Sequence, residues 1–183
     1  MRGVTHALPR NVALTYDDLR AMPDDGHRYE LVDGTLIVTP APKILHQRVV
    51  GRLIVVLSQA APDEYEVLPA PVDYVVSERT VLQPDVLVAR RSELGLDNLR
   101  RAPVLVVEVL SGSTRRIDLG TKRLAFEAAG VPSYWLVDPD EPALTVLELA
   151  AGSYHETTRV AGDEAWTAAS PFPVRIVAAE LVT

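Results

Sequence analysis

The stretch Pro103-Val-Leu-Val-Val-Glu-Val-Leu-Ser111 decides the fold of this chain. The seven residues between Pro103 and Ser111 are aliphatic except for Glu108. This length and this β-branched composition predict a strand that is covered on both faces of its sheet. An unpaired carboxylate in such a strand would be strongly destabilising, so Glu108 should either be neutralised or hold a cation.

A second acid, Asp85, opens another apolar run, residues 83–89. Side chains alternate between the two faces of a strand, so each acid shares a face with residues two and four positions away. The predicted face-mates are Val106 and Leu110 for Glu108, and Leu87 and Ala89 for Asp85. If the two strands are neighbours in suitable register, the carboxylates converge, and with a backbone carbonyl and waters they suit Mg²⁺ or Mn²⁺. The alternative is that either acid pairs with an arginine of the basic stretch, residues 90–123.

Composition predicts one soluble globular domain over residues 1–183. The chain is 48% hydrophobic, and its mean hydropathy is +0.10. No apolar stretch reaches the roughly 18 residues that a membrane-spanning helix needs. Residues 1–10 contain no apolar core of signal-peptide length. The absence of cysteine excludes disulfides and thiolate metal sites. We therefore expect a cytoplasmic protein that does not contact a membrane.

The charge distribution is uneven. The whole chain carries a net charge of −7, which argues against indiscriminate binding to nucleic acid. Residues 90–123, however, contain eight basic and four acidic side chains, so this segment has a net charge of +4. A positive zone beside the strand carboxylates would suit a substrate that bears phosphate. The alternative is a set of solvated arginines.

Periodicity predicts an alternation of strands and helices. Apolar residues recur at helical spacing over 44–60, and a second helix is expected over 115–129, ending at Gly130. Asp33-Gly34 predicts a tight hairpin, and Thr15 with Asp18 predicts a capping box. The expected strands are 28–32, 35–39, 65–68, 72–76, 85–89, 104–110, 133–137, 144–149 and about 154–160. The class is α/β or α+β, with a mixed sheet covered by helices and a helical crossover if the strands of Glu108 and Trp135 are parallel.

Lysine is rare in this chain. Of 18 basic residues, only Lys43 and Lys122 are lysine. A retained lysine indicates a role that arginine cannot fill, such as a compact charge. Lys122 lies four residues after Asp118, on the same face of the predicted helix. The alternative is a surface Asp118–Lys122 pair of little energetic weight.

The order of these motifs resembles the Uma-two family of predicted endonucleases, within the PD-(D/E)XK, restriction-endonuclease-like superfamily. The motifs are residues 28–34, 83–85, 107–111, 118–122 and 130–139. The resemblance covers about residues 14–177. It implies a restriction-endonuclease-like fold, in which a central mixed sheet carries the metal ligands between flanking helices, with an N-terminal β-hairpin.

The resemblance also implies roles for residues. Asp85 and Glu108 would bind Mg²⁺, with the Val109 backbone carbonyl completing the shell, and Glu30 would approach the same site. The superfamily's lysine, expected two residues after the glutamate, is Leu110 here. Lys122 from the following helix is then the candidate. Further predictions are phosphate contacts by Arg115, Arg116 and Arg123, and a place for His46 at the mouth of the site.

Two functions follow as expectations. The first is a Mg²⁺-dependent (or Mn²⁺-dependent) endonuclease that hydrolyses DNA phosphodiester bonds, with Glu30, Asp85, Glu108 and Lys122 as catalytic residues; related nucleases often cut duplexes as homodimers. The second is a catalytically silent nucleic-acid-binding or assembly module that retains the nuclease fold.

Overall fold

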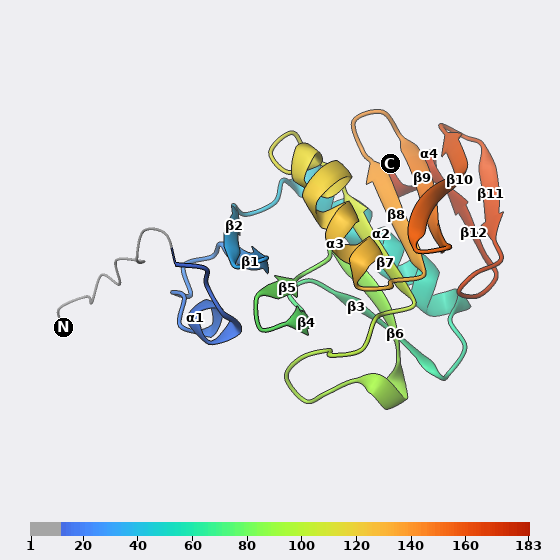
Figure 1. Cartoon of the computed structure of the whole chain (residues 1–183). Coiled ribbons are helices and arrows are strands. Elements are labelled where there is room, and N and C mark those ends of the chain that lie inside the picture. Colours follow the sequence, from blue (N-terminus) through green and yellow to red (C-terminus); the bar gives the residue numbers. More distant parts are fainter. Residues whose placement is uncertain (1–11) are drawn as a thin grey trace.

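A six-stranded mixed sheet forms the centre of the molecule in the computed structural model, which describes residues 12–183 (Figure 1). The strand order is β10-β9-β8-β7-β6-β3. Strands β7 and β8 are parallel, and the other neighbouring pairs are antiparallel. The strands are β3 (Tyr65–Pro69), β6 (Val86–Arg90), β7 (Leu105–Val109), β8 (Ser133–Asp138), β9 (Ala143–Ala150) and β10 (Ser153–Ala161).

Helices cover the two faces of this sheet. Helix α2 (Ile44–Ala60) packs on the face that includes Val107 and Val109. The opposite face is covered by the π-helix η2 (Ile117–Lys122) and the α-helix α3 (Arg123–Ala128) that continues it. Figure 1 shows α3 in front of the sheet and α2 behind it. Strand β7 is therefore buried on both faces, as its continuous apolar sequence predicts.

A second sheet, in the order β2-β1-β5-β4, lies to one side of the first (Figure 1). Its hairpin turns at Asp33-Gly34, where both residues have positive φ angles of 50° and 78°. This is the backbone of a two-residue turn that asparagine, aspartate and glycine favour. The elements here are α1 (Tyr16–Arg20), β1 (Arg28–Val32), β2 (Thr35–Thr39), β4 (Tyr74–Ser77) and β5 (Thr80–Leu82).

The register of β6 and β7 brings the two strand acids together. Val86 pairs with Val107 in this antiparallel ladder, so Asp85, one residue earlier, lies beside Glu108, one residue later. The predicted face-mates Leu87, Ala89, Val106 and Leu110 all belong to one buried cluster beneath α3. The predicted convergence of the two strands is confirmed.

Most of the predicted elements are confirmed, and some were missed. The long helix spans Ile44–Ala60 as expected, and Thr15 and Asp18 form the predicted capping box. The second helix contains a π-helical stretch that its sequence did not reveal. The short strand β5 was missed, as were the elements of the C-terminal region, which was predicted only as an apolar tail. The remaining elements are η1 (Arg91–Glu93), β11 (Ala165–Ala168), β12 (Val174–Val177) and α4 (Ala178–Val182).

The interpretation of residues 1–10 lies outside the described residues. Within residues 12–183, no helix is both long enough and apolar enough to cross a membrane.

Candidate active site

A buried lysine stands at the centre of the candidate site. Lys122 is 1% exposed, and its Nζ lies 2.8 Å from Glu108 Oε1 and 2.9 Å from Glu30 Oε1. Asp118 Oδ1 is 4.0 Å away. The alternative of a surface Asp118–Lys122 pair is wrong, because both side chains are buried and the closer partners of the ammonium come from strands. One lysine thus joins the helix to β1 and β7.

Glu30 reaches this cluster from the hairpin. It is fully buried on β1, and its Oε1 accepts a hydrogen bond of 2.7 Å from the backbone N–H of Gln83. Its other oxygen, Oε2, is buried without a hydrogen-bond partner. A buried carboxylate oxygen with free lone pairs is costly unless a water or cation satisfies it. Glu30 therefore offers an open acceptor inside the site.

Asp85 is held by three donors. Arg28 Nη1 lies 2.7 Å from Oδ1, while His46 Nε2, at 3.0 Å, and the backbone N–H of Val109, at 2.8 Å, both reach Oδ2. Arg28 and His46 come from β1 and α2, far from Asp85 in sequence. Three separate elements converge on one carboxylate.

The π-helix positions the lysine. Residues 117–122 form i→i+5 hydrogen bonds, a wider turn that is rare in proteins and frequent at functional sites. Tyr134 on β8 is fully buried, and its hydroxyl donates a 3.0 Å hydrogen bond to the backbone carbonyl of Asp118. This contact from the sheet fixes the wide turn above Glu108.

The electrostatics keep the lysine charged. Burial acts to lower the pKa of Lys122, but the carboxylates of Glu108 and Glu30 outweigh it and raise the pKa. Burial also acts to raise the pKa of Asp85, but the hydrogen bond from His46 and the charge of Arg28 hold that pKa below its ordinary value. For Asp118, burial raises the pKa to about 6.

The acids outnumber the permanent cations. Four buried carboxyl groups, those of Glu30, Asp85, Glu108 and Asp118, face Lys122 and Arg28, which leaves a formal charge of −2 when all four are ionised. Burial raises the pKa of Glu108 well above its ordinary value, with Lys122 opposing the shift. A divalent cation would balance the surplus.

The donor chemistry also fits a hard cation. Within residues 12–183, no three His, Cys, Asp or Glu side chains form a ready cage for an ion. Mg²⁺ does not need one, because it keeps several waters and is commonly bound through one or two carboxylates. Asp85 and Glu108 supply carboxylates, and Glu30 Oε2 is an unsatisfied acceptor beside them.

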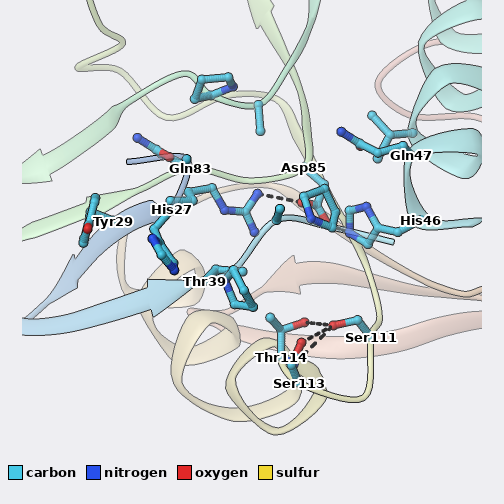
Figure 2. A pocket seen from close by; sticks show the side chains of 18 of the residues that line it. His27, Tyr29, Thr39, His46, Gln47, Gln83, Asp85, Ser111, Ser113 and Thr114 are labelled. Carbon is cyan, nitrogen blue, oxygen red and sulfur yellow. Dashed lines mark hydrogen bonds and ion pairs between the residues drawn. The ribbon is translucent and has the colours of Figure 1, made fainter. Parts of the chain in front are cut away.

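A cavity of about 750 Å³ opens onto one side of this cluster. Its wall includes Arg28, His46 and Asp85, whereas Glu30, Glu108 and Lys122 lie behind that wall. Figure 2 shows His46 and Asp85 close together, and it shows Ser111 joined to Ser113 and Thr114 by hydrogen bonds of 3.0 and 2.9 Å. The cavity is therefore lined by polar groups from the hairpin, from α2 and from the loop after β7.

Three predicted phosphate contacts lie away from this cavity. Arg115 pairs with Asp138 at 2.7 Å, and Arg123 donates to the Tyr154 carbonyl at 3.3 Å. Arg116 is exposed, and none of the three lines the cavity. Val109 contributes its N–H to Asp85. A metal-binding role for its carbonyl stays a prediction.

Sequence reasoning missed Arg28 and Gln83. Arg28 lies two residues before Glu30 on β1, and residues two apart share a face of a strand. This spacing could have placed Arg28 beside the carboxylates. Gln83 acts through its backbone N–H, and no side-chain pattern reports such a contact.

Comparisons with known proteins agree with this fold. Residues 16–180 match the family described as "Uma2: Putative restriction endonuclease". A solved structure from Anabaena variabilis, titled a putative nuclease belonging to DUF820, aligns with a TM-score of 0.73 at 19% identity. The alignment covers 92% of this chain and 97% of that one. No protein with a curated description matches the chain. The predicted restriction-endonuclease-like fold is confirmed.

Proposed function

The chain belongs to the Uma2 family, and from this membership and the geometry of the site we propose that it is a Mg²⁺-dependent endonuclease that hydrolyses DNA phosphodiester bonds. The observation that carries the proposal is the buried lysine held between Glu30 and Glu108, next to Asp85 and a cavity of about 750 Å³. Burying so many ionisable groups costs stability, and such clusters concentrate at functional sites.

Asp85 and Glu108 are the proposed ligands of Mg²⁺, and Mn²⁺ has the same preference for oxygen ligands. When bound, the ion would polarise the scissile phosphate and supply an activated water. Glu30 Oε2 is the open acceptor that would orient a water. The proposal of these ligands is supported by the surplus of carboxylates around Lys122 and Arg28.

Lys122 has two tasks in this proposal. It holds Glu108 and Glu30 through hydrogen bonds of 2.8 and 2.9 Å, so that their carboxylates keep a fixed orientation. Its charge would also stabilise the negative charge that grows on the phosphate oxygens in the transition state. Because the pKa of Lys122 is raised by its carboxylate neighbours, the ammonium donates protons in hydrogen bonds and does not act as a base at neutral pH.

A catalytically silent module is the second candidate, and two observations favour it. Both oxygens of Asp85 already accept hydrogen bonds, from Arg28, His46 and Val109. In that candidate, these three hydrogen bonds make Asp85 a structural link between β1, α2 and β7. The net charge of −7 also disfavours general binding to DNA.

Cleavage assays separate the two candidates. Purified full-length protein is incubated with supercoiled, linear duplex and single-stranded DNA, with Mg²⁺, with Mn²⁺ or with a chelator. Wild type should cleave at least one form in a metal-dependent manner. Glu108→Gln and Lys122→Met should each reduce the rate by about 100-fold or more.

The matched control is Glu156→Gln, which removes an exposed carboxylate on β10 and should leave the rate unchanged. Cleavage of equal rate in wild type, Glu108→Gln and Lys122→Met would show that a contaminating nuclease is responsible, and would favour the silent module. Gel filtration during the same experiment tests the prediction of a homodimer.

A further inference from the structure

Arg28 is paired with Asp85, a carboxylate that the proposed metal ion would need as a ligand. Its Nη1 lies 2.7 Å from Asp85 Oδ1, while the two hydrogen bonds to Oδ2 come from His46 and from Val109. Within residues 12–183, Arg28 is therefore the one hydrogen-bond donor to Oδ1. An ion that binds Asp85 through Oδ1 must share or replace this contact.

Arg28 also lies between the cavity and the rest of the site. Its side chain is 18% exposed and forms part of the cavity wall, whereas Glu30, Glu108 and Lys122 do not. It is therefore within reach of anything that enters the cavity.

The guanidinium is only partly satisfied where it lies. Nε is buried without a hydrogen-bond partner, and Glu30 Oε2, which lies 3.8 Å from it, is also unpartnered. Because Arg28 Nε and Glu30 Oε2 are farther apart than a hydrogen bond allows, this donor and this acceptor both remain unsatisfied. Arg28 therefore has donors in reserve for another acceptor, and guanidinium groups bind phosphate oxygens in pairs.

We propose that Arg28 is an exchangeable partner of Asp85: it holds Oδ1 when no divalent ion is bound, and it contacts the substrate phosphate once an ion has taken that oxygen. This inference rests on the proposed metal-dependent function. It assigns the phosphate contact to β1 and gives Arg28 a part in both metal binding and substrate binding.

Metal binding tests the first half. Calorimetric titration of full-length protein with Mn²⁺, without DNA, should give an affinity about tenfold higher for Arg28→Met than for wild type, because the competing contact is gone. The matched control is Arg20→Met. Arg20 lines the same cavity but does not contact Asp85, so its loss should change the affinity less than about threefold.

DNA binding tests the second half. The probe is a short DNA strand with bridging methylene phosphonate linkages, which keep the phosphate charge and replace the scissile P–O bond by a P–C bond that is not hydrolysed. With Mn²⁺ present, Arg28→Met should bind this strand about tenfold more weakly than wild type. Without Mn²⁺, Arg28 is engaged by Asp85, so the substitution should have little effect.

A measurement on wild type covers the case in which Arg28→Met does not fold. Guanidinium ¹⁵N resonances are recorded during titration with Mg²⁺, with Arg28→Lys used to assign the signal. The Arg28 Nε resonance should shift as the ion binds, and that of Arg115, paired with Asp138, should not.

Failure of the Arg28 exchange and failure of the metal-dependent nuclease proposal give different results. If Mn²⁺ binds wild type and Arg28→Met equally well, or if the loss of DNA affinity is the same with and without Mn²⁺, the exchange is overturned while the nuclease proposal stands. An unmoved Arg28 resonance at saturating Mg²⁺ also overturns it. If neither protein binds a divalent ion, the metal-dependent function fails, and the exchange fails with it.

Discussion

The two faces of β7 differ in what covers them. Val107 and Val109 point toward α2, a regular helix of 17 residues that contributes aliphatic side chains to a dry core. Glu108, on the other face, points toward the π-helix η2, which supplies Lys122. The same strand therefore supports an apolar core on one side and buried charges on the other. The difference shows that a carboxylate is tolerated in a central strand when the covering element carries its partner.

The largest loss of stability should come from removing Lys122, the partner of Glu108. Lys122→Met leaves Glu30 and Glu108 without their cation, and breaking a buried ion pair costs about 3–5 kcal/mol. The free energy of unfolding, measured with urea at pH 7.5, should fall by this amount. The loss should shrink at pH 5, because burial raises the pKa of Glu108 and its carboxyl group then binds a proton more readily. An equal loss at both pH values would contradict the account of the charged face.

The α2 face should respond as an ordinary core. Leu57→Ala removes a fully buried side chain and should cost about 3 kcal/mol through lost contacts and a cavity. In contrast with Lys122→Met, this loss should not depend on pH, and calorimetry should show unchanged affinity for Mn²⁺. A large change in that affinity would show that the two faces are not independent.

Substitution of Asp118 should raise the free energy of unfolding in a pH-dependent manner, whereas substitution of Lys122 should lower it. Burial raises the pKa of Asp118 to about 6, so the folded state binds the proton more tightly than the unfolded state. Stability from this group is present at pH 4 and is lost as pH rises through 6. Asp118→Asn should therefore be more stable than wild type by about 2 kcal/mol at pH 7.5. Thermal unfolding at several pH values checks this, and an advantage largest at pH 4 would contradict it.

The smallest loss of stability should come from removing the Tyr134 hydroxyl. Tyr134→Phe removes the hydrogen bond to the Asp118 carbonyl and leaves that buried acceptor unsatisfied, at a cost of about 1 kcal/mol. Because this contact fixes the wide turn, backbone amide exchange should accelerate in residues 117–122 more than in α2. Uniform acceleration across both helices would argue against a local role.

The sequence predicted one face of β7 better than the other. On the α2 side, helical periodicity over 44–60 gave the observed helix, because regular packing leaves a regular pattern. On the charged side, Glu108 and Asp85 stood out as acids in apolar strands, and Lys122 stood out because lysine is rare here. The family resemblance then placed Glu30 at the same site, and the position of His46 at the start of the long helix predicted its place at the mouth.

What the sequence did not predict depends on contacts that have no periodic signature. The π-helix has the composition of an ordinary helix, and the contact that fixes it comes from Tyr134, on a strand later in the chain. Strand β5 has three residues, too few to display alternation. Arg28 was not predicted because its partner Asp85 is 57 residues away, although the two residues lie in the motifs 28–34 and 83–85.

The wide turn before α3 ties the lysine to the length of the chain. A π-helical turn contains one residue more than an α-helical turn, so removing one residue would let this turn close to α-helical geometry. Deleting Gly120 would then change the spacing between Asp118 and Lys122 from four residues to three, while the fully buried Phe126 would keep α3 against the sheet. The wide turn therefore sets how Asp118 and the lysine face each other across one helical turn.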